Sequence, residues 1–212
     1  MKTLVFASNN AHKLEEIRAI LGDKFDIKSL KEIGCLDDIP ETGSTFRENA
    51  LQKAHYVKIH YGLDCFADDS GLQVESLGDE PGVFSARYAT LNGRDPLPTK
   101  DEANMDVLLE KLWKRCEDDK SLFTVNSPIT KACFRTSVAL AYGGEVHLFD
   151  GIVEGHIIPD KRGTEGFGYD PIFIPNGYDK TFAELGAEIK NGISHRARAV
   201  AKLADFLKGL EN

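Results

Sequence analysis

Short apolar runs alternate with stretches in which apolar residues recur at helical spacing, and this alternation constrains the fold more than any other feature. Residues 3–7 read as a buried strand, and Leu14, Ile17 and Leu21 then mark one face of a helix. A second strand-like run follows at 64–67, after another helical stretch. Strands that alternate with helices predict an α/β protein.

Cap and turn signals define several of the expected boundaries. Thr45 and Glu48 form a capping-box pattern that opens a second helix. Residues 132–142 alternate between two faces as a strand does, and the glycine pair at 143–144 predicts a two-residue hairpin turn. Ser194 is a candidate N-cap of the final helix.

Other segments are expected to be less regular. After the second strand, residues 68–71 are expected to turn before the chain resumes an extended course at 72–75. Residues 78–100 are rich in Gly, Pro and polar side chains and predict a long loop. A helix is expected around 101–116, followed by an irregular stretch at 117–130.

Composition weighs against several classes of protein. Asp and Glu number 34 against 26 Lys and Arg, and the net charge of -8 argues against a generic nucleic-acid binder. No apolar run approaches the ~18 residues of a membrane span, and the apolar stretch at 4–7 is too short for a signal peptide. The four cysteines match no zinc pattern and are expected to be reduced thiols. The chain is therefore expected to be cytoplasmic, with no nucleic-acid or membrane partner.

Polar residues follow the first strand directly. Ser8, Asn9 and Asn10 turn the chain into a helix, and Lys13 lies in its first turn. Free N–H groups and the positive end of the helix dipole suit a phosphate there, and Lys13 adds a full charge. On this segment alone, the plainer reading is favoured, with Asn10 as an N-cap and Lys13 as solvated surface.

Carboxylates supply the next candidates. Glu41 lies in a loop before the second helix, where it is either a magnesium ligand or an ordinary surface acid. Asp68 and Asp69 follow an apolar strand, a common place for metal ligands and general bases, although an Asx-turn explains them equally well. Asn49 and Lys53 are four residues apart and share one helix face.

Two later segments add aromatic and basic candidates. Residues 163–171 combine glycines with two aromatic rings but match neither the G-x-G-x-x-G pattern nor the P-loop. Their rings are either a platform on which a base stacks or part of the core. Lys190 and the tripeptide at 194–196 place cations near the last helix, where ordinary surface residues are the commoner reading.

Six blocks of the sequence occur in an order that a known family shares. The blocks are Ser8-x-Asn10-x-x-Lys13, Thr42-Gly43 with Glu48-Asn49-Ala50, Phe66 to Leu72, Pro81 to Tyr88, Gly166 to Pro171, and Ser194-His195-Arg196. In these blocks the chain resembles the Ham1-like inosine/xanthosine triphosphate pyrophosphatases. The resemblance runs from residue 3 to about residue 207.

The resemblance implies an α/β fold with an elongated central mixed β-sheet flanked by helices, and two lobes with an active-site cleft between them. It implies a single domain over residues 1–212. It also implies hydrolysis of nonstandard purine nucleoside triphosphates (ITP, dITP, XTP) to the nucleoside monophosphate and pyrophosphate, which clears them from the nucleotide pool. Mg²⁺ is the implied cofactor, and a homodimer is the implied assembly.

The resemblance further implies roles for individual residues. Asp69 would position or deprotonate the attacking water and, with Glu41, would serve the metal. Ser70 would lie at the substrate, and Phe167 would stack on the base. The other implied substrate contacts are on the phosphate side (Ser8, Asn10, Lys13 and Lys53, with Asn9 beside them), in the base pocket (Gly168, Tyr169 and Asp170) and on the base or sugar side (Lys190, His195 and Arg196).

Base choice has a physical rationale. Hypoxanthine and xanthine present an acceptor at O6 and a donor at N1, and adenine reverses both. A buried site matched to the first pattern rejects the second by roughly 10⁴-fold, because polar groups are left unpaired. Guanine shares the pattern of hypoxanthine, so its exclusion requires a further element near the 2-amino group.

Two departures and two alternative functions accompany the resemblance. Residues 114–130 are longer and more polar than the family pattern, and Lys131 stands where an arginine is expected. Both concern local structure or dimer contacts more than chemistry. One alternative is a related pyrophosphatase that acts on pyrimidine or methylated nucleotides. The other is a nucleotide-binding protein without turnover, against which the presence of Asp69, Lys13 and Lys53 argues.

Overall fold

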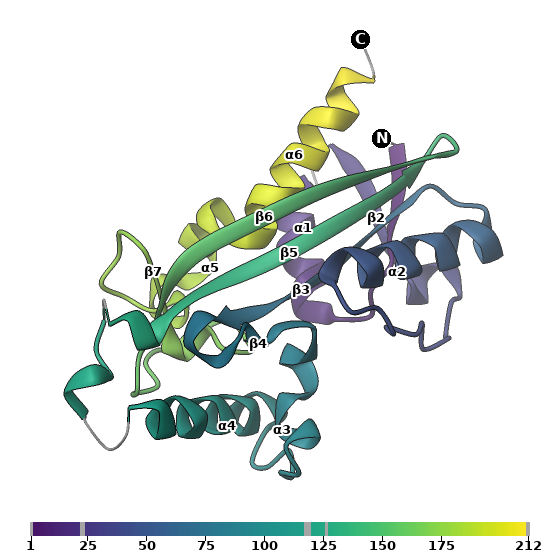
Figure 1. Cartoon of the computed structure of the whole chain (residues 1–212). Coiled ribbons are helices and arrows are strands. Elements are labelled where there is room, and N and C mark those ends of the chain that lie inside the picture. The colour runs from purple at the N-terminus through teal and green to yellow at the C-terminus, as the bar shows by residue number, and fades with distance from the viewer. Residues whose placement is uncertain (1, 22–23, 117–119, 126, 211–212) are drawn as a thin grey trace. The chain divides into compact units, whose positions relative to one another are not determined.

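The computed structural model describes residues 2–21, 24–116, 120–125 and 127–210 and has an α/β architecture (Figure 1). The strand order is β2-β1-β3-β5-β6-β7, with β4 paired to β3. The strands are β1 (Lys2–Phe6), β2 (Phe25–Ser29), β3 (Cys65–Val74), β4 (Glu80–Pro81), β5 (Lys131–Tyr142), β6 (Glu145–Ile157) and β7 (Phe173–Pro175). The helices are α1 (Ala11–Leu21), α2 (Phe46–Tyr61), α3 (Tyr88–Leu91), α4 (Lys100–Arg115), α5 (Phe182–Ile193) and α6 (His195–Gly209).

The sheet is mixed, as the resemblance implied. Strand β1 pairs in parallel with β2 and with β3, whereas β6 and β7 are antiparallel. The chain divides into two compact units, and β3, β5 and β6 each contribute residues to both of them. The first unit contains residues 1–69, 136–151 and 194–212, and the second contains residues 70–135 and 152–193. The predicted single domain and the cleft between two lobes both stay predictions.

The first unit has a helical layer on each face of its strands. Because side chains alternate along a strand, Leu4 and Phe6 of β1 face one side and Val5 faces the other. The first side is covered by α1 and α6, which contribute Ile17 and Leu203 to its core. The other side is covered by α2, whose buried residues pack against the second set of strand side chains. Burial on both faces explains the apolar strand sequences.

The second unit has one apolar core built around α4. Leu108 and Leu112 of this helix are fully buried and pack with Leu72 of β3. Three aromatic rings form the other part of this core, and the ring of Phe173 lies 4.8 Å from that of Phe134 and 5.3 Å from that of Phe182, between centroids. Helix α5 is kinked at Gly186, whose φ of 78° lies in the left-handed region.

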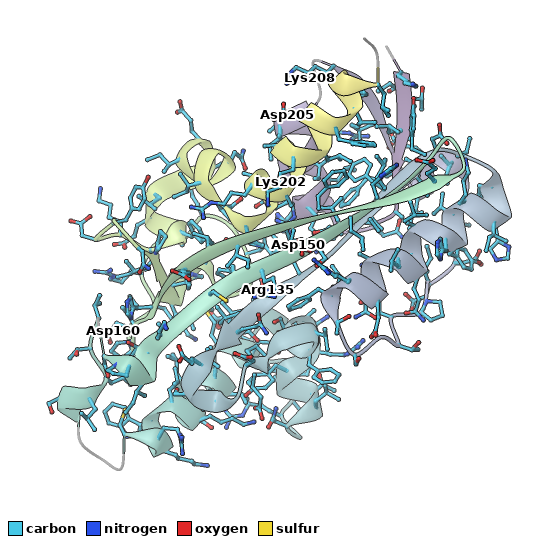
Figure 2. The ribbon with its side chains drawn as sticks, turned by 45° about the horizontal axis from the view of Figure 1, so that its top comes forward. Arg135, Asp150, Asp160, Lys202, Asp205 and Lys208 are labelled. Atoms are coloured by element: carbon cyan, nitrogen blue, oxygen red, sulfur yellow. The ribbon has the colours of Figure 1, made fainter. Side chains whose placement is uncertain are left out.

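Asp150 of β6 joins helices from both faces of the first unit to this strand. Its carboxylate accepts hydrogen bonds from Arg47 of α2 and from the Ser137 hydroxyl of β5, the latter at 2.7 Å. Its backbone carbonyl accepts a hydrogen bond from the Lys202 ammonium of α6 at 2.6 Å, and both residues are labelled in Figure 2. Strand β6 is thereby joined to α2 and α6 as well as to its neighbouring strand.

The predicted caps and the hairpin are confirmed. Thr45 and Glu48 form a complete capping box at the start of α2, and Ser194 caps α6 by accepting from the Ala197 N–H. Strands β5 and β6 are joined at residues 143–144 as the glycine pair predicted. The alternation predicted over 132–142 gives way to burial on both faces between Thr136 and Ala141.

The turn predicted at 68–71 is wrong. Strand β3 runs without interruption through both aspartates, because each carboxylate has buried partners that compensate its loss of water. The long loop predicted at 78–100 is also wrong in its first half. That stretch contains β4, a 3₁₀ helix over Gly82–Arg87 and the short helix α3. Their buried Tyr88 and Ala89 belong to the core of the second unit.

The polar stretch at 114–130 is described in part. Helix α4 ends at Arg115, a 3₁₀ turn covers Pro128–Thr130, and the prediction for residues 117–119 and 126 lies outside the described residues. Lys131, which replaces an expected arginine, forms a 2.8 Å ion pair with Glu75. The four cysteines are not joined by disulfides. Within the described ranges, every helix is too short or too polar to cross a bilayer.

The backbone contact at Gly151 gives a stability prediction. A Cβ at this position would meet the carbonyl oxygen of His195 and lie 2.8 Å from the Ala199 nitrogen, so α6 would have to move away from β6. We expect Gly151→Ala to lower the free energy of unfolding by about 1–3 kcal/mol, as overpacking does. Urea denaturation followed by circular dichroism measures this change.

Gly209→Ala is the matched control. Gly209 belongs to α6, the helix that the Gly151 Cβ would meet, and an added Cβ at Gly209 has open space around it. Alanine favours helix over glycine, so the control variant is expected to be as stable as the wild type or slightly more stable. An unchanged urea midpoint for Gly151→Ala would contradict the close approach of α6 to β6.

Candidate active site

The first set of candidate residues lies at a topological switch point within the first unit. Strand β1 lies between β2 and β3, and α1, which follows β1, and α2, which precedes β3, cover opposite faces. In α/β sheets, ligands bind at the carboxyl ends of the strands where the connections diverge in this way. Phe6 pairs with Phe66, so the segment after β1 leaves the sheet level with Asp68 and Asp69.

The segment after β1 starts α1 with polar side chains. The Ser8 hydroxyl accepts a hydrogen bond from the Asn10 N–H at 3.2 Å, and the Asn10 side chain accepts one from the Lys13 N–H at 3.1 Å. Asn10 therefore caps α1, as the plainer reading of this segment predicted, but that reading is wrong for Lys13, whose ammonium is not solvated and pairs with Asp68. Asn9 and Asn10 are exposed and Ser8 is half-buried. The positive end of α1 thus carries exposed amide side chains, a suitable environment for an anion.

Asp68 is fully buried and holds two cations. It accepts hydrogen bonds from the Lys13 ammonium at 3.0 Å and from the Arg196 Nε at 3.1 Å. Arg196 is itself 1% exposed, and Glu16 of α1 pairs with its guanidinium. Burial favours the neutral carboxyl, but Lys13 and Arg196 outweigh burial and hold the pKa of Asp68 well below its usual range. The charge of Lys13 near the start of α1 is therefore balanced by a protein carboxylate.

Asp69 faces the opposite helical layer. It accepts a hydrogen bond from the Asn49 side-chain amide at 2.9 Å, and its backbone carbonyl accepts one from Thr136 at 3.1 Å. Burial raises the pKa of Asp69, and the nearby Lys53, Lys13 and Asn49 oppose that rise without cancelling it. The two adjacent aspartates consequently have pKa values shifted in opposite directions.

Lys53 connects the two aspartates to the loop before α2. Its ammonium donates to the Asp68 backbone carbonyl at 2.7 Å and pairs with the Glu41 carboxylate. Asn49 and Lys53 lie one turn apart and both point toward β3, as the shared helix face predicted. Glu41 is near enough to Asp69 to favour its neutral form.

The start of α6 is buried rather than solvated. His195 is 4% exposed and Arg196 is 1% exposed. Lys13 shares the Asp68 carboxylate with Arg196. Burial lowers the pKa of the Lys13 ammonium, and Asp68 opposes this shift. The contact of His195 and Arg196 with a base or sugar stays a prediction, and what the structure adds is the pairing of Arg196 with two carboxylates.

The second set of candidates lies within the second unit. Lys190, at 4% exposure, donates to the Asp170 carboxylate at 2.6 Å. Its ammonium lies 4.6 Å from the centre of the half-buried Phe167 ring, within the range of a cation–π contact. Asp170 also accepts from the Phe167 N–H at 2.9 Å. Lys190 and Asp170 together hold the aromatic segment in place.

The remaining candidates of this unit are held by hydrogen bonds to distant segments. Tyr169 is 3% exposed, and its hydroxyl donates to the Ser85 carbonyl at 2.9 Å. The Gly168 N–H donates to the Asp101 carboxylate at 2.7 Å. Ser70 follows Asp69 in β3, and the boundary between the two units falls between them.

The sequence-based prediction missed three residues that position others. Glu16 holds Arg196, Thr136 holds the Asp69 carbonyl, and Asp101 holds Gly168. Only Glu16 left a local signal, because it stands three residues after Lys13 and so on the same face of α1. The other two contacts join segments 67 residues apart and leave no periodic pattern.

Comparison with known proteins adds a family to this geometry. Residues 4–206 match the model of the Ham1 family. The chain belongs to the Ham1 family. It is 53% identical over 207 residues to the dITP/XTP pyrophosphatase of Porphyromonas gingivalis, with 98% of each chain covered. It is 43% identical over 210 residues to the dITP/XTP pyrophosphatase of Bacillus subtilis, again with 98% of each covered.

Solved structures of Ham1 proteins have the same fold. A HAM1 protein from Coxiella burnetii matches with a TM-score of 0.82 and 36% identity, over 99% of this chain and 100% of that one. The Staphylococcus aureus Ham1 protein matches with a TM-score of 0.79 and 37% identity, over 98% and 99% of the two chains. These matches confirm the predicted α/β fold and the predicted family.

The carboxylates of the first set fit part of a magnesium site. Within the described ranges, no three His, Cys, Asp or Glu side chains converge as a closed metal cage. Glu41 and Asp69 offer two sets of oxygen donors. Mg²⁺ is usually held by one or two carboxylates, with water and substrate phosphates completing its octahedron. The residues present therefore fit such an ion.

The hydrogen bond from Asn49 gives a prediction about the Asp69 pKa. This bond stabilises the charged carboxylate, so its removal in Asn49→Leu should raise the Asp69 pKa further above its ordinary value. NMR titration of the ¹³C-labelled Asp69 carboxyl measures the shift directly, without any assay of activity.

Gln52→Leu is the control for this titration. Gln52 lies on the same helix, but its side chain bonds Thr42 instead of an aspartate. The Gln52→Leu variant should therefore leave the Asp69 pKa at the wild-type value. An unchanged or lower Asp69 pKa in Asn49→Leu would contradict the assignment of the Asn49 bond.

Proposed function

We propose that this protein hydrolyses nonstandard purine nucleoside triphosphates, namely ITP, dITP and XTP, to the nucleoside monophosphate and pyrophosphate. The arrangement around β3 carries this proposal, because it sets a buried carboxylate, Asp69, beside Lys53 and Glu41. Relatives named dITP/XTP pyrophosphatase, at 53% and 43% identity over nearly full length, support the choice of substrate. Such an enzyme would clear these nucleotides from the pool.

The phosphate side of the substrate is assigned to the first unit. Negative charge grows on the phosphate oxygens as the anhydride bond breaks, and cations fixed in place offset it without reorganising. Lys13 and Lys53 are held by Asp68, so they are such cations. The further proposed contacts on this side are Ser8, Asn9 and Asn10, at the positive end of α1.

Asp69 is the proposed catalytic residue. Its carboxylate would orient the attacking water and accept its proton as the water oxygen bonds to the α-phosphorus, the α–β anhydride bond breaks and pyrophosphate leaves. A raised pKa makes a carboxylate a stronger base, closer to what proton transfer at neutral pH requires. The bonds from Asn49 and Thr136 would keep the carboxylate in place during this step.

Glu41 and Asp69 are the proposed Mg²⁺ ligands. When bound, this ion supplies positive charge to phosphate oxygens and makes water more acidic. Lys53, which pairs with Glu41, would keep that loop carboxylate beside the site.

The proposed base contacts centre on Phe167. Phe167 would stack on the purine, which contributes roughly 1–3 kcal/mol for an aromatic ring under a base. Gly168, Tyr169 and Asp170 would line the same pocket, and Ser70 would lie at the substrate. Lys190, His195 and Arg196 complete the proposed base and sugar contacts.

Assembly, organisation and location belong to the same proposal. By resemblance to its family, the protein forms a homodimer and acts in the cytoplasm, with no nucleic-acid or membrane partner. The 212 residues act as one domain, which the passage of three strands through both units supports. Light scattering of the purified protein tests the dimer.

Asp69→Asn is expected to abolish turnover while the protein stays folded. Loss of a general base typically lowers the rate by about 10²–10⁴-fold, measured here as pyrophosphate release from ITP. Because the folded-state pKa of Asp69 is raised, its ionisation at pH 7 opposes folding, and asparagine removes that cost. The urea midpoint at pH 7 should therefore equal or exceed that of the wild type.

The control for this variant is Asp205→Asn. Asp205 is an exposed carboxylate of α6 that pairs with Lys208 (Figure 2). Its removal should change neither turnover nor stability appreciably, as is usual for an exposed ion pair. A near-normal rate in Asp69→Asn would remove its assigned role.

A substrate panel tests the choice of base and the bond that is cleaved. With Mg²⁺ present, ITP and XTP should be hydrolysed to monophosphate and pyrophosphate in preference to dUTP and modified pyrimidine triphosphates. The larger stacking area of the two-ring base over Phe167 is the physical reason, because uracil presents the same acceptor and donor pair as hypoxanthine. Equal or faster pyrimidine turnover would reject the purine assignment, and ITP binding without hydrolysis would identify a binding protein.

A further inference from the structure

Two successive backbone N–H groups of the aromatic segment in the second unit are bound by carboxylates. The Phe167 N–H donates to Asp170 at 2.9 Å, and the Gly168 N–H donates to Asp101 at 2.7 Å. These nitrogens lie on either side of the Phe167 Cα, so the two bonds together restrict its φ and ψ angles. The backbone of Phe167 is therefore fixed from both directions.

The chain around Phe167 needs such fixing. Gly166 and Gly168 have φ values of 80° and 64°, a conformation that glycine adopts and leaves easily. An added Cβ on Gly166 would meet the Asp170 carboxylate, so the chain passes very close to that side chain. The two acceptors fix the backbone of this segment, and the Lys190 ammonium lies against the Phe167 ring itself.

The two acceptors come from different parts of the unit. Asp170 is local and also binds Lys190, whereas Asp101 lies 67 residues earlier in the first turn of α4. The start of α4 is itself well anchored. Thr99 caps it by accepting from the Glu102 N–H at 3.1 Å, and the Asn104 side chain accepts from the Ala89 N–H at 2.8 Å. Asp101 thus ties the glycine segment to a rigid helix.

We propose that Asp101 is a positioning residue for base recognition, which holds the Gly168 N–H and thereby sets the direction of the Phe167 ring. The role rests on the proposed function, in which that ring meets a purine. A ring held in its stacking position before the ligand arrives loses less freedom on binding, and affinity rises accordingly. Asp101 does not touch the phosphates in this scheme, so it acts on binding and not on bond cleavage.

The test compares Asp101→Ala with Glu102→Ala. Both acids lie in the first turn of α4 and favour its dipole equally, so helix stability is matched between the variants. What distinguishes Asp101 is its contact with the glycine segment, because its carboxylate accepts a hydrogen bond from the Gly168 N–H. Asp101→Asn serves as a conservative rescue, because its amide oxygen still accepts a hydrogen bond. Asp101→Ser, a good residue near a helix start but too short to reach Gly168, replaces the alanine variant if that one misfolds.

The first readout is independent of activity. Amide hydrogen exchange at Gly168, followed by NMR, should be faster in Asp101→Ala, restored in part by Asp101→Asn and unchanged in Glu102→Ala. The second readout is kinetic. Asp101→Ala should raise the KM for ITP about tenfold, because the loss of one charge-assisted hydrogen bond weakens binding by about that factor. The kcat and the inhibition constant of pyrophosphate should stay unchanged.

Each remaining outcome overturns a definite statement. Wild-type exchange at Gly168 and a wild-type KM in the Asp101 variants would refute the positioning role. An equal effect of Glu102→Ala would reduce the role to helix stability, and a loss confined to kcat would refute an action on binding. If the wild-type protein hydrolyses no nucleotide at all, the proposed function fails, while the exchange measurement still decides whether Asp101 fixes the segment.

Discussion

Adjacent side chains of a β-strand point to opposite faces, and the arrangement of the first unit depends on this alternation in β3. Asp68 faces the layer of α1 and α6, where it meets Lys13 and Arg196. Asp69 faces α2, where it meets Asn49. One dipeptide therefore connects three helices to the sheet and brings their polar side chains to the end of β1. A turn at the same place would have brought both carboxylates to one edge.

The two environments give chemically identical groups different properties. Two cations hold the Asp68 pKa down, so this group is a permanent counter-charge whose contribution to stability is present above about pH 4 and falls as the pH drops below it. Asp69 has the opposite shift, because burial outweighs its cations. Neighbouring groups whose pKa values are pushed apart are typical of acid–base sites. The pairing of Lys13 and Arg196 with Asp68 also limits the desolvation cost of burying them.

Local signals in the sequence predicted much of the fold. The capping box at Thr45, the cap at Ser194 and the glycine hairpin at 143–144 are each confirmed, because such features depend on residues within four positions of one another. The prediction at 68–71 and the first half of that at 78–100 are wrong because polar and glycine-rich composition suggested turns and loops there. In both places, burial against distant helices outweighed local preference.

The sequence by itself determined the alternation of strands and helices, several caps and a hairpin turn, the family and the residue types available for phosphate, metal and base. Only the tertiary structure decided which partner each charged group has. Lys13 and Asp68 are 55 residues apart, and Arg196 and Asp68 are 128 apart, so no local period connects them. Their pairing follows from the packing of the sheet and its helices, which places these groups where water is absent and only another charge can stabilise them.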